Sequence, residues 1–139
     1  MADPVLIDSG PLVALLNRSE HDHPWVLAQF KELHYELQTC EAVLLESYFL
    51  VRHNPQGIVA LLDLLNSGVV RVNFALDHHL AAVTALMRKY QDVPMSLADA
   101  CLVRMSELHD RSRVFTLDSD FRLYRRNGRQ SIPLIYPAR

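Results

Sequence analysis

Lysine and cysteine are scarce in this chain of 139 residues. Lysine occurs only at Lys31 and Lys89 and the formal net charge is −2, so the chain lacks the overall positive charge of a general nucleic-acid-binding protein. Its two cysteines, Cys40 and Cys101, stand far apart and outside any CxxC or Cys/His metal spacing. This pattern predicts a reducing compartment, in which both thiols act as small core residues.

Long apolar runs are absent as well. No run approaches the roughly 20 residues that a membrane-spanning helix needs, and no basic segment followed by a long apolar stretch marks a signal peptide. We therefore expect a cytoplasmic protein with no membrane partner. Hydrophobic residues make up 50% of the chain, which is enough for a sizeable core, and we expect residues 1–139 to form a single domain.

Short β-rich runs alternate with helical stretches along the chain. Strands are predicted at 4–7, 37–40, 69–74, 113–117 and 132–136. Helices are predicted to begin at residue 12, after a Ser-Gly-Pro turn, and at residue 25, and to span 41–51, 58–65, 77–90 and 96–109. Strands separated by helices pair in parallel, so the expected fold is a three-layer α/β/α sandwich with a mainly parallel central sheet.

The segment VLIDSGPLVALL, from Val5 to Leu16, places the carboxylate of Asp8 between two apolar stretches. Burying such a charge costs free energy unless a partner satisfies it. Asp8 therefore either caps the following helix or binds a cation. Asp118 likewise follows a predicted strand directly, and the carboxyl ends of parallel strands meet at one edge of a sheet. We expect Asp8 and Asp118 to share that edge.

Two further acids stand in unusual surroundings. Asp99 ends the stretch SLAD, which fits a capping box with Ser96 as N-cap, but the small residues that follow leave space beside its carboxylate. Glu46 has apolar neighbours, although glutamate is rarely buried without a partner. Each acid alone has a structural explanation. Together they predict one cleft of carboxylates, which must protonate or bind cations, and all-oxygen ligands favour Mg²⁺ or Mn²⁺ over zinc.

Four segments in this order resemble the PIN-domain family, which includes the VapC-type toxin ribonucleases: VLIDSGPLVALL, TCEAVLLES, MSLADACLVRM and FTLDSDF. The likeness extends over essentially the whole chain. It implies a metal-dependent endoribonuclease that hydrolyses RNA phosphodiester bonds with a four-carboxylate Mg²⁺ or Mn²⁺ site. The catalytic residues it implies are Asp8, Glu46, Asp99 and Asp118, with Asp8, Asp99 and Asp118 as metal ligands. Secondary roles fall to Asp120, Ser9 and Thr116.

The resemblance also implies partners. RNA is the expected substrate, an antitoxin protein is the expected partner of a toxin, and a homodimer is the expected assembly. Arginines just after Asp120 are predicted to contact the RNA backbone, namely Arg122, Arg125 and Arg126. Tyr124 is a candidate for stacking on bases, whereas Phe121 is interpreted as a core residue. The alternative is a non-catalytic PIN fold that binds RNA or another protein. Loss of pocket acids would favour that alternative, and the sequence shows no such loss.

Overall fold

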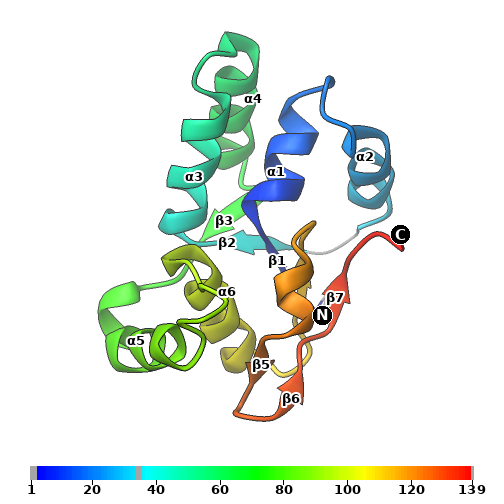
Figure 1. Ribbon diagram of the computed structural model, residues 1–139. Coiled ribbons are helices and arrows are strands. Elements are labelled where there is room, and N and C mark those ends of the chain that lie inside the picture. Colours follow the sequence, from blue (N-terminus) through cyan, green and yellow to red (C-terminus); the bar gives the residue numbers. More distant parts are fainter. Residues whose placement is uncertain (1–2, 34–35, 139) are drawn as a thin grey trace.

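The computed structural model describes residues 3–33 and 36–138, in which five short strands form a parallel sheet (Figure 1). The order across the sheet is β3-β2-β1-β4-β7, and each neighbouring pair is parallel. The strands are β1 (Val5–Ile7), β2 (Leu37–Thr39), β3 (Val70–Val72), β4 (Arg113–Phe115) and β7 (Leu134–Ile135). The predicted parallel sheet is therefore confirmed, with β1 at its centre.

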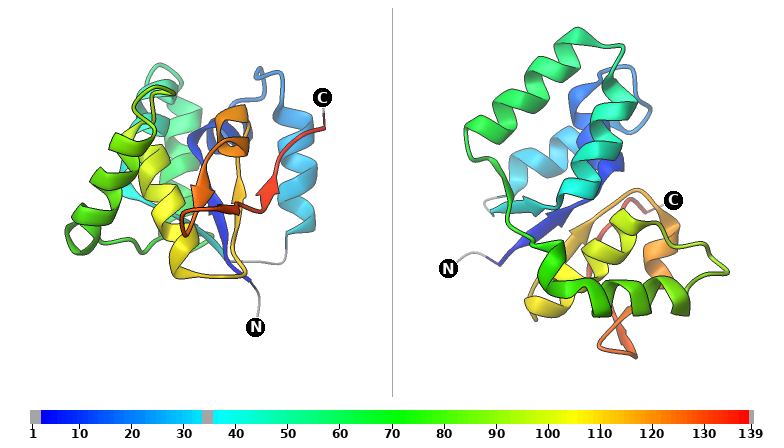
Figure 2. Two further views of the ribbon diagram at one scale, coloured as in Figure 1. Left: turned by 60° about the horizontal axis from the view of Figure 1, so that its bottom comes forward. Right: turned by 90° about the vertical axis from the view of Figure 1, so that its left-hand side faces the viewer.

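Helices cover both faces of this sheet. They are α1 (Ser9–Leu16), α2 (His23–Glu32), α3 (Glu41–Val51), α4 (Pro55–Asn66), α5 (Leu80–Lys89) and α6 (Leu97–Leu108). Two 3₁₀ turns, η1 (Leu76–His79) and η2 (Ser119–Arg122), complete the helical segments. In Figures 1 and 2, α1, α2 and α4 lie on one side of the strands, and α5 and α6 lie on the other. The predicted three-layer sandwich is confirmed. Throughout the part of the chain that is described, the helices are too short or too polar to span a membrane.

Alternate residues of the central strands pack against opposite helical layers. Leu6 and Val114 belong to the core that contains α5 and α6, whereas Val5, Ile7 and Phe115 belong to the core that contains α1, α2 and α4. This alternation follows from the two-residue side-chain period of a β-strand. Because both faces are covered, all of β1 and the last two residues of β4 are apolar and buried, and the acids Asp8 and Asp118 come after the strands have ended.

The structure differs from the sequence prediction at helix starts, and each strand of the sheet is shorter than predicted. Helix α1 begins at Ser9 rather than at residue 12, and α4 begins at Pro55 rather than at residue 58. The Gly10-Pro11 turn is therefore the first turn of α1. Proline is tolerated there because its missing N–H would have no partner within the helix. At α4, the Asn54 side chain caps the helix by accepting a hydrogen bond from Gly57 N at 3.1 Å.

A small antiparallel hairpin was missed. It pairs β5 (Arg125–Arg126) with β6 (Gln130–Ser131) and turns at Asn127 and Gly128, whose φ angles are 52° and 84°. The Asn-Gly dipeptide is a strong signal for such a turn. The sequence interpretation assigned its flanking arginines to an RNA-binding surface instead.

Candidate active site

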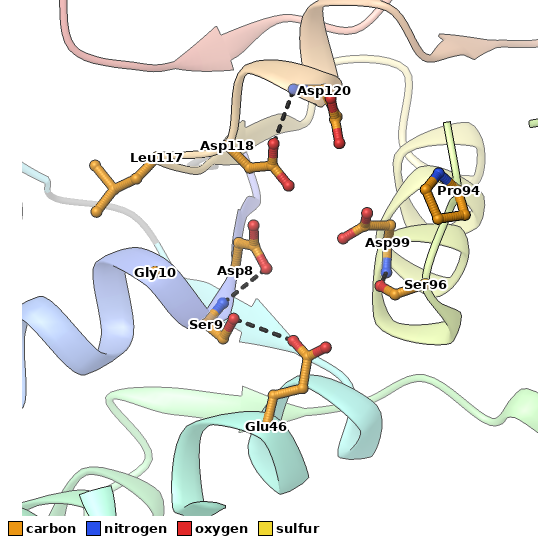
Figure 3. A pocket seen from close by; sticks show the side chains of 10 residues that line it. All are labelled: Asp8, Ser9, Gly10, Glu46, Pro94, Ser96, Asp99, Leu117, Asp118 and Asp120. Atoms are coloured by element: carbon orange, nitrogen blue, oxygen red, sulfur yellow. Dashed lines mark hydrogen bonds between the residues drawn. The ribbon is translucent and has the colours of Figure 1, made fainter. Parts of the chain in front are cut away.

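A cavity of about 460 Å³ opens at the edge of the sheet where the parallel strands end. Its lining comes from the end of β1, from α3, from the start of α6 and from the segment after β4. The lining residues are Asp8, Ser9, Gly10, Glu46, Pro94, Ser96, Asp99, Leu117, Asp118 and Asp120. Figure 3 shows five carboxylates directed toward one common space, with the Leu117 side chain turned away from it. The structure thus brings together all four acids singled out in the sequence, and Asp120 with them.

Asp8 serves as a helix cap and also faces the pocket. Its Oδ1 accepts a hydrogen bond from Ser9 N at 2.7 Å, at the start of α1. Its side chain is only 5% exposed. Burial, reinforced by the charges of Asp99 and Glu46, raises the pKa of Asp8 to about 7, although hydrogen bonds from Thr116 and Ser9 oppose the rise. The two readings of the VLIDSG segment are therefore compatible, since the cap satisfies one oxygen while the carboxylate lines the cavity.

Two hydroxyl groups connect the acids. Thr116 Oγ1 donates to Asp8 Oδ2 at 2.8 Å and accepts from Asp118 N at 3.0 Å, so one buried hydroxyl fixes the relative positions of two acidic residues. Ser9 Oγ donates to Glu46 Oε1 at 3.1 Å, which ties α3 to the start of α1. Ser9 and Thr116 therefore orient the carboxylates through hydrogen bonds, although neither supplies a charge.

Asp99 enters the pocket from the first turn of α6. Its backbone N–H donates to Ser96 Oγ at 3.0 Å, so the predicted N-cap is present. Its carboxylate Oδ2 accepts a hydrogen bond from the Tyr124 hydroxyl at 2.8 Å. Burial raises the pKa of Asp99 above its usual range, and the charges of Asp118 and Glu46 add to the rise. Asp99 is thus electrostatically linked to acids from two other segments.

Asp118 and Asp120 form the side of the pocket that follows β4. Asp118 Oδ1 accepts from Asp120 N at 2.9 Å and caps η2. The pKa of Asp120 is raised by partial burial and by the neighbouring charge of Asp118. Strand β4 ends at Phe115, two residues earlier than predicted, yet Asp118 still reaches the same edge as Asp8.

The donor set of this pocket fits a hard divalent cation. All five charged groups are carboxylates, and burial together with their mutual repulsion raises the pKa values of Asp8 and Asp99. A cation would relieve that repulsion, and Mg²⁺ and Mn²⁺ prefer oxygen ligands. Within residues 3–33 and 36–138, no three His, Cys, Asp or Glu side chains already converge closely enough to hold an ion. Binding would therefore bring carboxylates of this cavity closer together than they lie in this structure.

The structure changes the interpretation of the arginine segment. Arg126 is only 4% exposed, and its guanidinium donates to Ser106 O and Asp110 O, at and beyond the end of α6. The prediction that Arg126 contacts RNA is therefore wrong, because this side chain satisfies carbonyl groups near the end of a helix. Arg122 is exposed, with its guanidinium 5.2 Å from the Tyr136 ring centroid. Arg125 is half-buried, and its Nη1 donates to three carbonyls near the end of η2.

The aromatic residues of this segment are also buried. Tyr124 is 0% exposed and Phe121 is 1% exposed. Tyr124 therefore cannot stack on a base, whereas the interpretation of Phe121 as a core residue agrees with the structure. The contact between Tyr124 and Asp99 was missed because 25 residues separate them and no local spacing signals it.

Comparison with known proteins assigns the fold. No protein-family model matches this chain, and no curated protein matches it in sequence. Among solved structures, it is similar to VapC20 of Mycobacterium tuberculosis, a toxin that cleaves the sarcin-ricin loop. The TM-score is 0.72 at 21% sequence identity, over 84% of this chain and 91% of that one. The chain has a VapC-type PIN fold. The resemblance found in the sequence is thus confirmed at the level of the fold, and the PIN-type sheet explains why acids from separate segments meet at one edge.

Proposed function

We propose that this protein is a metal-dependent endoribonuclease that hydrolyses RNA phosphodiester bonds at the carboxylate pocket. The observation that carries the proposal is the gathering of Asp8, Glu46, Asp99, Asp118 and Asp120 in one cavity of a PIN-type fold. The alternative, a non-catalytic RNA-binding or protein-interaction module, is less well supported. A pocket kept only for binding a polyanion has no need of five repelling carboxylates, two of them largely buried.

In the proposed reaction, Asp8, Asp99 and Asp118 hold Mg²⁺ or Mn²⁺. A bound divalent ion supplies a water of lowered pKa and neutralises charge on the scissile phosphate. Glu46 orients the attacking water, and the hydrogen bond from Ser9 Oγ keeps its carboxylate directed into the pocket. Thr116 holds Asp8 and the Asp118 backbone in register, so that both carboxylates approach the same point. Asp120 has a secondary role beside Asp118.

We further propose that the chain, as a single domain, acts in the cytoplasm as the toxin of a toxin–antitoxin pair. The similarity to a toxin over most of both chains supports this proposal. The partners would be an RNA substrate, a cognate antitoxin protein and a second copy of the chain in a homodimer.

The test of the function is cleavage of a synthetic single-stranded RNA by the purified protein. We expect cleavage with Mg²⁺ or Mn²⁺ and none in excess EDTA, with activity restored when Mg²⁺ is added back. The matched control is Asp77→Asn, which removes an exposed acid of η1 outside the pocket and should cleave like the wild type. Cleavage that persists in EDTA would contradict the proposed mechanism. Metal-independent RNA binding without any cleavage would favour the non-catalytic alternative.

The exposed arginine beside the pocket provides a second test. Arg122 lies in η2 with Asp120, so we propose that it contacts the RNA backbone, together with Arg125. Arg122→Ala should weaken RNA binding irrespective of sequence and reduce the slope of log affinity against log salt by about 0.7 for each lost phosphate contact. Binding is measured in an Asp8→Asn background to prevent cleavage.

Arg129→Ala is the matched control, because it removes the same charge from an exposed site near the tip of the β5–β6 hairpin. It should leave the slope unchanged. If Arg122→Ala and Arg129→Ala give the same slope as the parent protein, Arg122 makes no phosphate contact.

A further inference from the structure

Tyr124 is a buried tyrosine whose hydroxyl group is directed at a pocket acid. The side chain is fully buried, and its hydroxyl donates to Asp99 Oδ2 at 2.8 Å. The ring is clamped between two aromatic neighbours in edge-to-face contact: Phe121 at a centroid distance of 5.1 Å and Tyr90 at 5.1 Å. Such packing fixes the ring and therefore fixes the position of the hydroxyl oxygen.

We infer that Tyr124 is the positioning residue that keeps the Asp99 carboxylate directed into the cavity, where it would bind the metal, an inference that rests on the proposed function. Asp99 projects from the first turn of α6, and its carboxylate points into the cavity (Figure 3). A carboxylate can rotate about its side-chain bonds, so its direction must be set by partners. Tyr124 binds one of its two oxygens from outside the cavity lining and restricts that rotation.

A phenol suits this position for a chemical reason. It donates one hydrogen bond to the carboxylate without bringing a positive charge that would compete with a cation. Lysine or arginine would neutralise Asp99 instead. Partners behind a metal ligand typically contribute 10- to 100-fold to metal affinity, because they orient the ligand before the ion arrives. Tyr124 comes from the segment after η2, so it also couples the position of α6 to the segment that carries Asp118 and Asp120.

The experiment compares two tyrosine-to-phenylalanine variants of the same aromatic cluster. Tyr124→Phe keeps the ring and removes the hydroxyl that binds Asp99. Tyr90→Phe is the matched control, because the Tyr90 hydroxyl accepts a hydrogen bond from Arg125 N at 2.9 Å rather than contacting an acid. Mn²⁺ affinity is measured by calorimetry and by the electron paramagnetic resonance signal of free Mn²⁺. Crystal structures of both metal-free variants locate the Asp99 carboxylate.

We expect Tyr124→Phe to bind Mn²⁺ about 10-fold more weakly than the wild type, with the Asp99 carboxylate displaced from its position in the cavity. Tyr90→Phe should retain wild-type affinity even if it melts at a lower temperature. Wild-type affinity in Tyr124→Phe, or an undisplaced Asp99 carboxylate, would overturn the positioning role and leave the proposed function intact. A wild-type protein that binds no Mn²⁺ would overturn the proposed function and this inference together. An equal loss of Mn²⁺ affinity in both variants would assign the effect to general packing of the aromatic cluster. That result would also overturn the positioning role of Tyr124.

Discussion

Asp8→Asn is expected to lower ribonuclease activity by at least about 100-fold, because it removes the charge of a proposed metal ligand. A catalytic metal ion contributes several kcal/mol of transition-state stabilisation. A change of about 1.4 kcal/mol in the activation free energy corresponds to a tenfold change in rate. The fold should survive. Asparagine can still accept the hydrogen bond from Ser9 N, and the Thr116 hydroxyl can rotate to accept from the new amide. The variant should also melt at a higher temperature than the wild type in EDTA at pH 8, since one buried, repelled charge is gone.

The measurement is RNA cleavage together with thermal unfolding in EDTA. Asp77→Asn again serves as the control, since it removes an exposed acid of η1. Asparagine caps helices about as well as aspartate. If Asp8→Asn cleaves RNA at the wild-type rate, Asp8 is a helix cap and nothing more. If it melts at a lower temperature than the wild type in EDTA, the Asp8 charge is satisfied by contacts and is not a source of repulsion.

The metal-free protein is expected to lose stability as the pH rises from 5 to 8. The pKa of Asp8 is about 7 in the folded protein and 3.8 when unperturbed. Between these values the folded state binds more protons than the unfolded state, so the free energy of unfolding falls as pH rises. This contribution of Asp8 is complete below pH 3.8 and is lost as pH passes through about 7. The raised pKa values of Asp99 and Asp120 act in the same direction.

The slope for one such group is at most about 1.4 kcal/mol per pH unit. Denaturant unfolding in EDTA at several pH values measures it. Asp8→Asn should reduce the slope of this curve by up to the value expected for one proton. Mg²⁺ should restore most stability at pH 8 and least at pH 5, because protons and the cation compete for the same carboxylates. An equal Mg²⁺ effect at both pH values would mean that the ion binds elsewhere.

The layer structure could be predicted from the sequence because it depends on local patterns. Helix α3 was predicted with its observed bounds, since its apolar positions recur at helical spacing and Asn54 and Pro55 follow it. Asp8 and Asp118 could be placed at one edge because strand order in an alternating α/β chain implies parallel pairing. The bounds of α1 and α4 were harder to predict, since a proline can mark either a turn or the first turn of a helix.

Most contacts within the site could not be predicted from the sequence. The bond from Thr116 to Asp8 spans 108 residues, and the bond from Tyr124 to Asp99 spans 25. Neither has a local signature. Burial of Arg126 was equally hidden, because Arg122, Arg125 and Arg129 lie within four residues of it and suggest a solvated surface. Only the packing of the hairpin against the end of α6 brings its guanidinium to carbonyl oxygens. Long-range geometry thus decides which polar residues serve the pocket and which support the fold.

The bond between Asp8 and Thr116 has a consequence for the way the protein is made. Asp8 directly follows β1 and Thr116 directly follows β4, and β1 pairs with β4 only after residues 113–115 exist. A nascent chain that contains only the first hundred residues therefore carries an incomplete set of the pocket acids. Such a chain lacks Asp118 and Thr116, which donates the hydrogen bond to Asp8. The proposed site can therefore form only after residues 116–120 have been synthesised.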